Sequence, residues 1–326
     1  MSDSRQLLTD MADGLFAELS GADFAAAWPR IAEAGFATLL VAEGEGGFGG
    51  DWGDAYAVMR LAGRHALAAP VADAVIAHGL LAASGIDAPE GYVAFAAPGQ
   101  RLPYGRHAAA VVTVQDGDLK LYPASACGFE EGLDPAGEPL DAVAFIGDPL
   151  ATAPCAADPM ALGAFARVAQ TAGAVEAAFT LTLDHVNQRV QFGKPLGKFQ
   201  AVQQAMAELS VEAAAVDAAG QSMAAAFDFA ATSGESADFE VAAAKLRANI
   251  AIEKSFPIAH RLHGAIGFTM EYSLNRFTRR LMGWRGQYGN DAFWSERLGR
   301  QVAAIGGAGL WTEIAARGDR QAAGRT

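Results

Sequence analysis

The most constraining feature of this chain is the stretch Arg189-Val-Gln-Phe-Gly-Lys-Pro-Leu-Gly-Lys-Phe-Gln200, which lies between two long helical patterns. Arg189 ends the first pattern, the segment 193–197 redirects the chain, and Phe199 with Gln200 opens the second helix. Two helices must therefore meet at a tight turn, which presents a guanidinium beside an aromatic ring and an amide. A planar cationic fork of this kind suits a pyrophosphate.

The apolar residues after this turn recur at steps of three and four, which predicts one long helix with a single face in the core. They are Phe199, Val202, Met206, Leu209, Ala213 and Val216. The segment 234–237 breaks the pattern, so a further helix is expected to begin near Asp238. Asp291 is expected to cap a fourth helix that runs to the region of Arg317.

The residues before this region divide into two parts with different patterns. Apolar residues recur at helical spacing from about residue 5 to 86, with Gly and Pro between the runs, which predicts four helices. Short apolar or alternating runs follow at 92–96, 110–114, 119–122 and 142–146, and tight-turn signals separate them, which predicts strands. The segment 102–107 is expected to be a loop that leads into a strand. The segment 149–159 is expected to be a linker.

These patterns predict an α+β fold with an N-terminal helical domain (1–88), a short middle β domain (89–152) and a C-terminal four-helix bundle (153–326). The chain has 326 residues, of which 52% are hydrophobic and 19% charged, so it is expected to fold around a large core. More than one packed unit is expected at this length.

The charge of the chain excludes some classes of partner. A net charge of −13 disfavours nucleic acid and anionic membrane surfaces, since both need a basic footprint. The cationic residues are nevertheless concentrated, because residues 185–300 hold 13 Lys and Arg against 11 Asp and Glu. Two cysteines, Cys127 and Cys155, predict no disulfide framework. With no secretory signal pattern and no long apolar run, a soluble cytoplasmic protein is expected.

Several separated motifs occur in an order that is typical of one family. A helical block from Ala27 to Glu43 precedes the loop Gly44-Glu-Gly-Gly-Phe-Gly-Gly50, and Leu61-Ala-Gly-Arg64 lies in the next helix. The turn at 189–200 follows, and then His263-Gly-Ala-Ile-Gly-Phe-Thr-Met-Glu271. From about residue 27 to 310 the chain resembles the acyl-CoA dehydrogenases, flavoenzymes that remove hydrogens from the α and β carbons of acyl-CoA thioesters.

The resemblance implies a FAD site that is shared between two subunits. One subunit's middle domain holds the flavin ring, and its neighbour's C-terminal helices hold the pyrophosphate and adenosine. Arg189, Phe192 and Gln200 match the three family residues of that second half. A further adenosine-side block usually reads Gln-x-x-Gly-Gly-x-Gly. Its counterparts here include Arg261, Gly264 and Ala265, so an arginine and a methyl group replace an amide and a glycine.

The residues on the catalytic side depart further from the family. The middle domain is short and has no clear counterpart of the family's segment against the flavin ring. The family places its catalytic glutamate at one of two positions, which fall here on Gly163 and near Tyr288, and neither is a carboxylate. Asp291 lies three residues from the second position and is the candidate base only if the loop is remodelled.

Three interpretations follow from this uneven site. The first is a subunit without the catalytic base in an α2β2 acyl-CoA dehydrogenase, of the type that bacteria use to degrade steroids and other bulky acyl-CoA substrates. Its partner would be a homologous subunit that holds the flavin ring and the base. The second is a self-sufficient homo-oligomer with an unusual base. The third is a flavin-free scaffold or acyl-CoA-binding protein. For the enzyme, the family implies electron-transfer flavoprotein as the electron acceptor.

Overall fold

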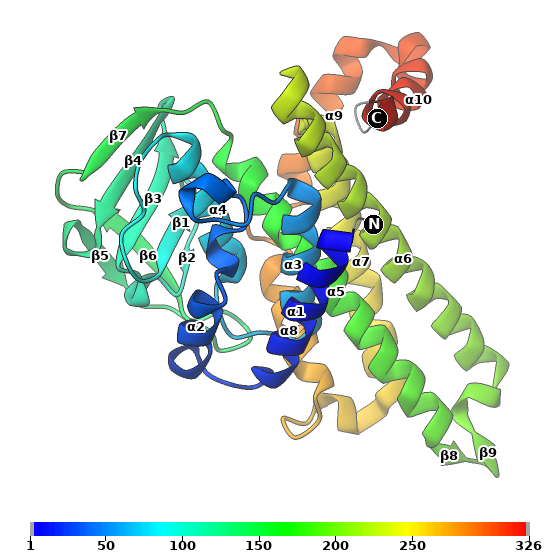
Figure 1. The fold of residues 1–326 in the computed structure, drawn as a ribbon. Helices are drawn as coiled ribbons and strands as arrows, with labels where there is room; N and C mark the ends of the chain where they lie inside the picture. The colour runs from blue at the N-terminus through cyan, green and yellow to red at the C-terminus, as the bar shows by residue number, and fades with distance from the viewer. Residues whose placement is uncertain (1–2, 324–326) are drawn as a thin grey trace.

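The computed structural model describes residues 3–323 and has a β unit on one side of a helical body (Figure 1). Four α-helices form the N-terminal part, as predicted for residues 5–86: α1 (Asp3–Glu18), α2 (Phe24–Glu33), α3 (Trp52–Arg64) and α4 (Val71–Ala83). Asp23 caps α2, and Asp51 with Asp54 forms a capping box at the start of α3. The loop between α2 and α3 contains the short 3-10 helices η1 (Phe36–Thr38) and η2 (Glu43–Glu45).

The β unit consists of two small sheets with the strand orders β1-β3-β4-β7 and β2-β6-β5. The strands of the first sheet are β1 (Val93–Ala96), β3 (Ala110–Gln115), β4 (Asp118–Pro123) and β7 (Ala151–Pro154), with β1 and β3 parallel. Those of the second are β2 (Leu102–Pro103), β5 (Cys127–Glu130) and β6 (Leu140–Phe145). The strands expected at 92–96, 110–114, 119–122 and 142–146 are confirmed.

Two expectations for this unit were wrong. Residues 151–154 are not a linker, because they form β7 and pair antiparallel with 118–121 of β4. The segment 102–107 contains β2, which pairs with Leu140 and Asp141 of β6, and a 3-10 turn, η3 (Gly105–His107). Both strands are short and contain proline, and non-local partners supply their ladder hydrogen bonds, so the local pattern carries little strand signal.

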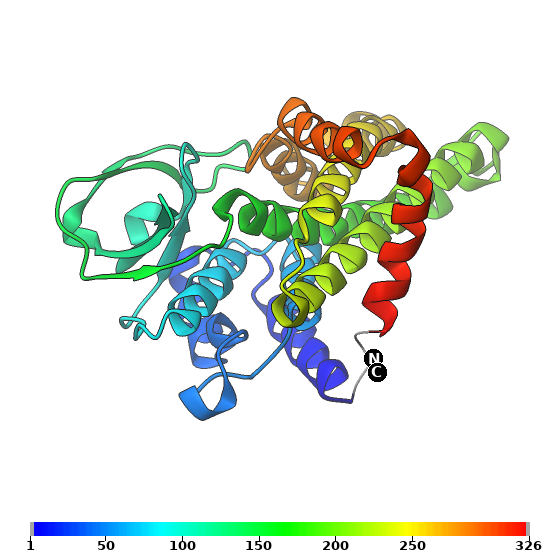
Figure 2. The same ribbon diagram turned by 90° about the horizontal axis from the view of Figure 1, so that it is seen from above.

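The C-terminal part is a bundle around α5 (Pro159–Gln188), which packs against α3, α6, α7 and α8 (Figures 1 and 2). The other helices are α6 (Gln200–Ser233), α7 (Asp238–His263), α8 (Leu274–Trp284), α9 (Asp291–Ile305) and α10 (Gly307–Ala323). Every residue from Ala161 to Val175 is buried, which makes α5 the central helix of the fold. The family's three-part α+β architecture is thereby confirmed.

The last helices differ from the expectation. Asn290, not Asp291, caps α9, since its side chain accepts a hydrogen bond from the N–H of Phe293. The pattern that was expected to run to Arg317 is two helices, because Gly306 at φ 78° ends α9 before α10 begins.

One continuous hydrophobic core joins the N-terminal helices, the β unit and the bundle. A second small cluster ties α5, α6 and α7 together at the far end of the bundle. It consists of Val186, Ala205, Met206, Leu209 and Ile258. This cluster anchors the turn between α5 and α6. Within residues 3–323, no helix is long and apolar enough to cross a membrane.

Candidate functional site

The turn between α5 and α6 is a β-hairpin that projects from the end of the bundle (Figure 1). The strands β8 (Val190–Gln191) and β9 (Lys194–Pro195) pair, and Phe192 and Gly193 form the turn with φ values of 52° and 78°. Positive φ at both positions is the geometry of a tight hairpin, and it is strained at a phenylalanine. The ring of Phe192 is 90% exposed. A strained turn therefore holds a large apolar ring in solvent.

Cations without carboxylate partners surround this hairpin. Every arginine from Arg5 to Arg167 is paired with a carboxylate. In contrast, the exposed side chains of Arg189, Lys198 and Arg261 make no ion pair within the part of the chain that the structure describes. Lys194 lies over the ring of Phe199, with its Nζ 4.4 Å from the ring centroid. The hairpin end therefore carries positive charge that no side chain of the described region neutralises.

The start of α6 adds to this positive end. Phe199 occupies the N-cap position, and no side chain caps the helix there. Gln200 is the first residue of α6 and is exposed. The first N–H groups of a helix have no partner within the helix, and its dipole favours anions at this end. Arg189, Phe192 and Gln200 are thus presented together by one hairpin and the helix that follows it.

The glycine block lies at the same end of the bundle. The imidazole rings of His185 on α5 and His263 on α7 stack with centroids 4.4 Å apart, which joins the two motifs. Burial lowers the pKa of both histidines, so the positive charge there comes from arginine and lysine. Arg261, Gly264 and Ala265 are all exposed, at the last turn of α7 and the start of η6 (Gly264–Phe268).

The two glycines of this block have different roles. Gly264 has a φ of 66°, and nothing lies within 4 Å of the place where its Cβ would be. A Cβ on Gly267 would lie 2.9 Å from the Cβ of His263, so this second glycine is needed for packing. Only Gly264 leaves its backbone open to close approach by a ligand.

The positions where the resemblance places the catalytic carboxylate lie elsewhere, and they touch each other. Tyr288 is in the loop between α8 and α9, and its buried ring fills the space into which a Cβ of Gly163 would project. Its O–H donates a hydrogen bond to Oδ1 of Asp73 on α4 at 3.3 Å, and its N–H donates to Oε1 of Gln100 at 2.8 Å. Contacts on several sides therefore fix the ring of Tyr288 in place.

Arg167 on α5 completes this buried cluster. Its guanidinium lies over the ring of Tyr288 at 5.2 Å and is 3.6 Å from Oδ1 of Asp73. It also donates to Gln287 at 2.7 Å and to Gln170 at 2.5 Å. Burial raises the pKa of Asp73, and the charge of Arg167 opposes that rise. The polar cavity beside these residues measures only about 30 Å³. An acyl thioester needs a pocket of roughly 300 Å³ or more.

Comparison with known proteins agrees with this arrangement of elements. A family model described as the C-terminal domain of acyl-CoA dehydrogenases matches residues 154–307, which span α5 to α9. The chain is also 28% identical over 266 residues to the acyl-CoA dehydrogenase IpdE2 of Mycobacterium tuberculosis, over 78% of this chain and 80% of that protein. Residues 154–307 therefore match the C-terminal domain of acyl-CoA dehydrogenases, and most of the chain is similar to one such enzyme.

Other acyl-CoA dehydrogenases match over less of their length or at lower identity. The glutaryl-CoA dehydrogenase of Desulfococcus multivorans is 36% identical over 107 residues, which cover 33% of this chain and 27% of that protein. Among solved structures, the steroid ACAD Tcur3481-Tcur3483 has a TM-score of 0.82 at 20% identity and covers 92% of this chain and 98% of its own. The ChsE4-ChsE5 complex of M. tuberculosis has a TM-score of 0.77 at 18% identity and covers 93% and 98%.

Asp291, the first residue of α9, is held in a surface network. Its carboxylate accepts hydrogen bonds from Nδ2 of Asn249 at 2.7 Å and from Arg285 at 2.9 Å. Burial alone would raise the pKa of Asp291, but the hydrogen bonds from Asn249 and Arg285 outweigh it and lower the pKa. Asp291 does not line the small cavity beside Asp73 and Arg167. As an acid–base residue it would therefore need a different loop conformation.

Sequence reasoning missed the cluster that occupies the centre of the molecule. Asp73 and Arg167 were not singled out, although each is a lone charge inside an otherwise apolar helical run. Two such charges of opposite sign on different helices indicate that the helices pack together through a buried ion pair, because a buried charge requires a partner. Their common contact with Tyr288 depends on the folded loop and has no local signal.

Proposed function

We propose that this chain is the supporting subunit of a FAD-dependent acyl-CoA dehydrogenase. It contributes the pyrophosphate and adenosine side of a shared flavin site, and a homologous partner contributes the flavin-ring pocket and the catalytic base. The observation that carries the proposal is the contact between Tyr288 and Gly163. The ring of Tyr288 fills the space from which a catalytic base at either position would act. The exposed cationic hairpin between α5 and α6, at the end of the bundle, supports the retained half of the site.

The residues of the hairpin end fit the phosphate and adenosine parts of FAD. Arg189, Lys198 and Arg261 offer unpaired cations for two phosphates, and the exposed ring of Phe192 can stack on a base. The amide of Gln200 and the open start of α6 add hydrogen-bond donors. When bound, FAD supplies the acceptor for the hydride that leaves the β carbon. The present chain would hold the cofactor from the side away from the reacting atoms.

We infer that the substrate is a bulky acyl-CoA such as a steroid thioester, and that an electron-transfer flavoprotein reoxidises the enzyme. The fold likeness to a steroid acyl-CoA dehydrogenase and to a complex of two different chains supports this inference. The small size of the cavity beside Asp73 and Arg167, about 30 Å³, supports a thioester site in the partner. One substrate site would then form per pair of unlike subunits.

The test is an acyl-CoA dehydrogenase assay with an artificial electron acceptor on the pure chain and on the chain co-expressed with a homologous subunit. Activity is expected only in the mixed complex, and Asp291→Asn in this chain should leave it unchanged. Replacing the candidate glutamate of the partner should abolish it. Activity of the pure chain that is lost in the Asp291→Asn variant would instead establish a self-sufficient enzyme. A complex whose flavin content and activity do not change in the Arg189→Ala variant of this chain would establish a scaffold.

A further inference from the structure

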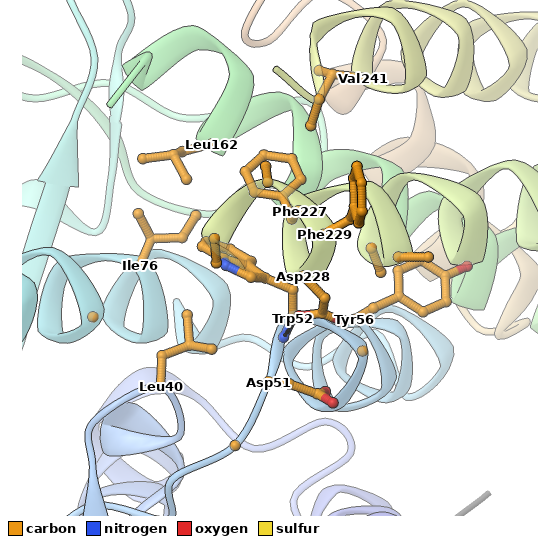
Figure 3. Close-up of a pocket in the computed structure, with 18 of the residues that line it drawn as sticks. Leu40, Asp51, Trp52, Tyr56, Ile76, Leu162, Phe227, Asp228, Phe229 and Val241 are labelled. Carbon is orange, nitrogen blue, oxygen red and sulfur yellow. Dashed lines mark hydrogen bonds between the residues drawn. The ribbon is translucent and has the colours of Figure 1, made fainter. Parts of the chain in front are cut away.

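A wide cleft of about 1740 Å³ opens between the N-terminal helices and the end of α6 (Figure 3). Apolar residues line its interior, with Trp52 and Tyr56 on α3, Phe227 on α6 and Leu162 on α5. The rings of Trp52 and Phe227 lie 4.7 Å apart. None of the lining residues belongs to the small cavity beside Asp73 and Arg167 or to the hairpin end. The cleft is therefore separate from the site proposed above.

The rim of this cleft is strongly acidic. Eight carboxylates line it against three arginines, Arg5, Arg60 and Arg64. Each of these arginines is already paired with a carboxylate of the chain. The carboxylates are Asp10, Asp13, Asp51, Asp158, Asp217, Asp228, Glu235 and Asp238. Asp13, Asp51 and Asp217 pair with these arginines, and Asp158 and Asp238 pair with Arg297. The eight carboxylates still outnumber these four arginines, so the net charge of the rim is negative, which disfavours the phosphates of a CoA ester and favours a cationic occupant.

Asp228 shows that the negative charge reaches the apolar interior. Its carboxylate accepts a hydrogen bond from the backbone N–H of Trp52 at 2.7 Å, and it has no ion pair with a lysine or arginine of the described residues. Figure 3 shows Asp228 along the same cleft as Trp52, Phe227 and Phe229. Burial raises the pKa of Asp228 to about 6, so the carboxylate is held in an environment that a nearby cation would stabilise. A carboxylate beside aromatic rings suits an ammonium or guanidinium group.

The size of the cleft indicates a polypeptide. Pockets for small ligands measure roughly 300–1,000 Å³, whereas this cleft is larger and is bounded by helices from both halves of the chain. A helix with its side chains is about 10 Å across and binds such grooves by its apolar face. We propose that the cleft is a docking groove for a basic amphipathic helix of a partner polypeptide, with apolar side chains on Trp52 and Phe227 and a lysine or arginine at Asp228.

The experiment uses the pure chain, without flavin or partner, so its outcome is independent of the proposed dehydrogenase function. Two labelled synthetic helices of about 18 residues, or five turns, carry the same leucine face with either lysine or glutamate on the polar face. Binding is measured by fluorescence anisotropy. The leucine–lysine helix should bind, with an affinity that falls as salt is added, and the leucine–glutamate helix should not bind.

A matched pair of variants on α6 locates the binding. Ala231 is exposed and lines the cleft, whereas Ala207 is exposed on the same helix and does not. Ala231→Lys should weaken binding of the leucine–lysine helix about tenfold, or roughly 1.4 kcal/mol, and Ala207→Lys should leave it unchanged. Phe229→Ser should also weaken it if circular dichroism shows that the variant is folded.

Three results would overturn the proposal. They are equal binding of both helices, no binding of the leucine–lysine helix, or the same loss in the Ala207→Lys control as in the cleft variant. Binding of dodecyltrimethylammonium without binding of the helix would assign the cleft to a small cationic amphiphile and would also overturn it.

Discussion

The ring of Tyr288 lies against the bare backbone of Gly163, in the space where any other residue at 163 would place its Cβ. These are the two positions at which the family resemblance places a catalytic carboxylate. In this chain they fit each other as glycine and tyrosine, and Asp73 and Arg167 fix the tyrosine from the other sides. The packing is consistent with a subunit whose own catalytic centre has become part of the core.

Gly163→Ala tests this packing directly. The added methyl group must displace a buried ring that contacts on several sides hold in place, so the free energy of unfolding should fall by about 1–3 kcal/mol. Urea denaturation of both proteins measures the change. Gly286→Ala is the control, because nothing lies within 4 Å of the place where its Cβ would be. Equal stability of the Gly163→Ala variant and the native protein would show that the ring is not fixed.

The buried pair of Asp73 and Arg167 should act as one unit. Arg167→Met leaves the carboxylate of Asp73 buried without its cation and should lower the free energy of unfolding by about 3–5 kcal/mol. The double variant Asp73→Leu/Arg167→Met should recover part of this loss, since no unpaired charge remains. Unfolding curves of both single variants and the double variant measure the coupling. A double variant that is less stable than the native protein by the sum of the two single losses would contradict the pairing.

Much of the fold follows from local sequence signals, but the buried cluster of Asp73, Arg167 and Tyr288 does not. The turn at 189–200 was predictable because glycine and proline interrupt two helical patterns within a few residues. β7 was missed because Ala151–Pro154 becomes a strand only through its partner β4. The resemblance indicated the hairpin residues Arg189, Phe192 and Gln200. It gave no sign that Asp73 would meet Tyr288, since these residues are far apart in the sequence and meet only in the folded chain.

Lys245 on α7 should make stability depend on pH. Its ammonium is buried and donates to Oδ1 of Asn249 and to the carbonyls of Trp284 and Arg285 at 2.9–3.2 Å. Burial, and then the charge of Arg167, lowers the pKa of Lys245 from 10.5 to about 7. Between these values the unfolded chain holds a proton that the folded chain lacks. The free energy of unfolding should therefore rise with pH between about 7 and 10.5, by at most about 1.4 kcal/mol per unit, and this gain is lost progressively as pH falls back to about 7.

The measurement for Lys245 is a set of urea unfolding curves at pH 7, 8 and 9. The native protein should become more stable over this interval, and Lys245→Met should remove the rise. Lys198→Met, at an exposed lysine, is the control and should keep it. The same pH dependence in the Lys245→Met variant as in the native protein would refute the assignment.

Substitution of Phe192 should weaken flavin binding and leave the stability of the chain unchanged. Its ring is 90% exposed, so Phe192→Ala should change the free energy of unfolding of the pure chain by less than about 0.5 kcal/mol. In the mixed complex the same variant should release flavin more readily, because the ring is proposed to contact the adenosine. Flavin retention during gel filtration measures this effect. Normal retention would remove Phe192 from the proposed site.

Arg189→Ala should raise the Kd of the mixed complex for FAD about tenfold or more, since a charge-assisted hydrogen bond contributes about 1.5–3 kcal/mol. Arg300→Ala is the control, because Arg300 is an exposed arginine that pairs with Glu296 on the surface of α9. Titration of the apo complex with FAD, followed by flavin fluorescence, compares the two variants. Equal Kd values for both would contradict a role of Arg189 at the phosphates.

The central claim is that this chain supplies one half of a flavin site. The most direct test is the visible absorption spectrum of the chain purified alone, recorded together with its mass in solution, before and after co-expression with a homologous subunit. We predict no stoichiometric flavin on the chain alone and flavin absorption in a complex that contains both chains. One flavin per chain in the protein purified alone would contradict it.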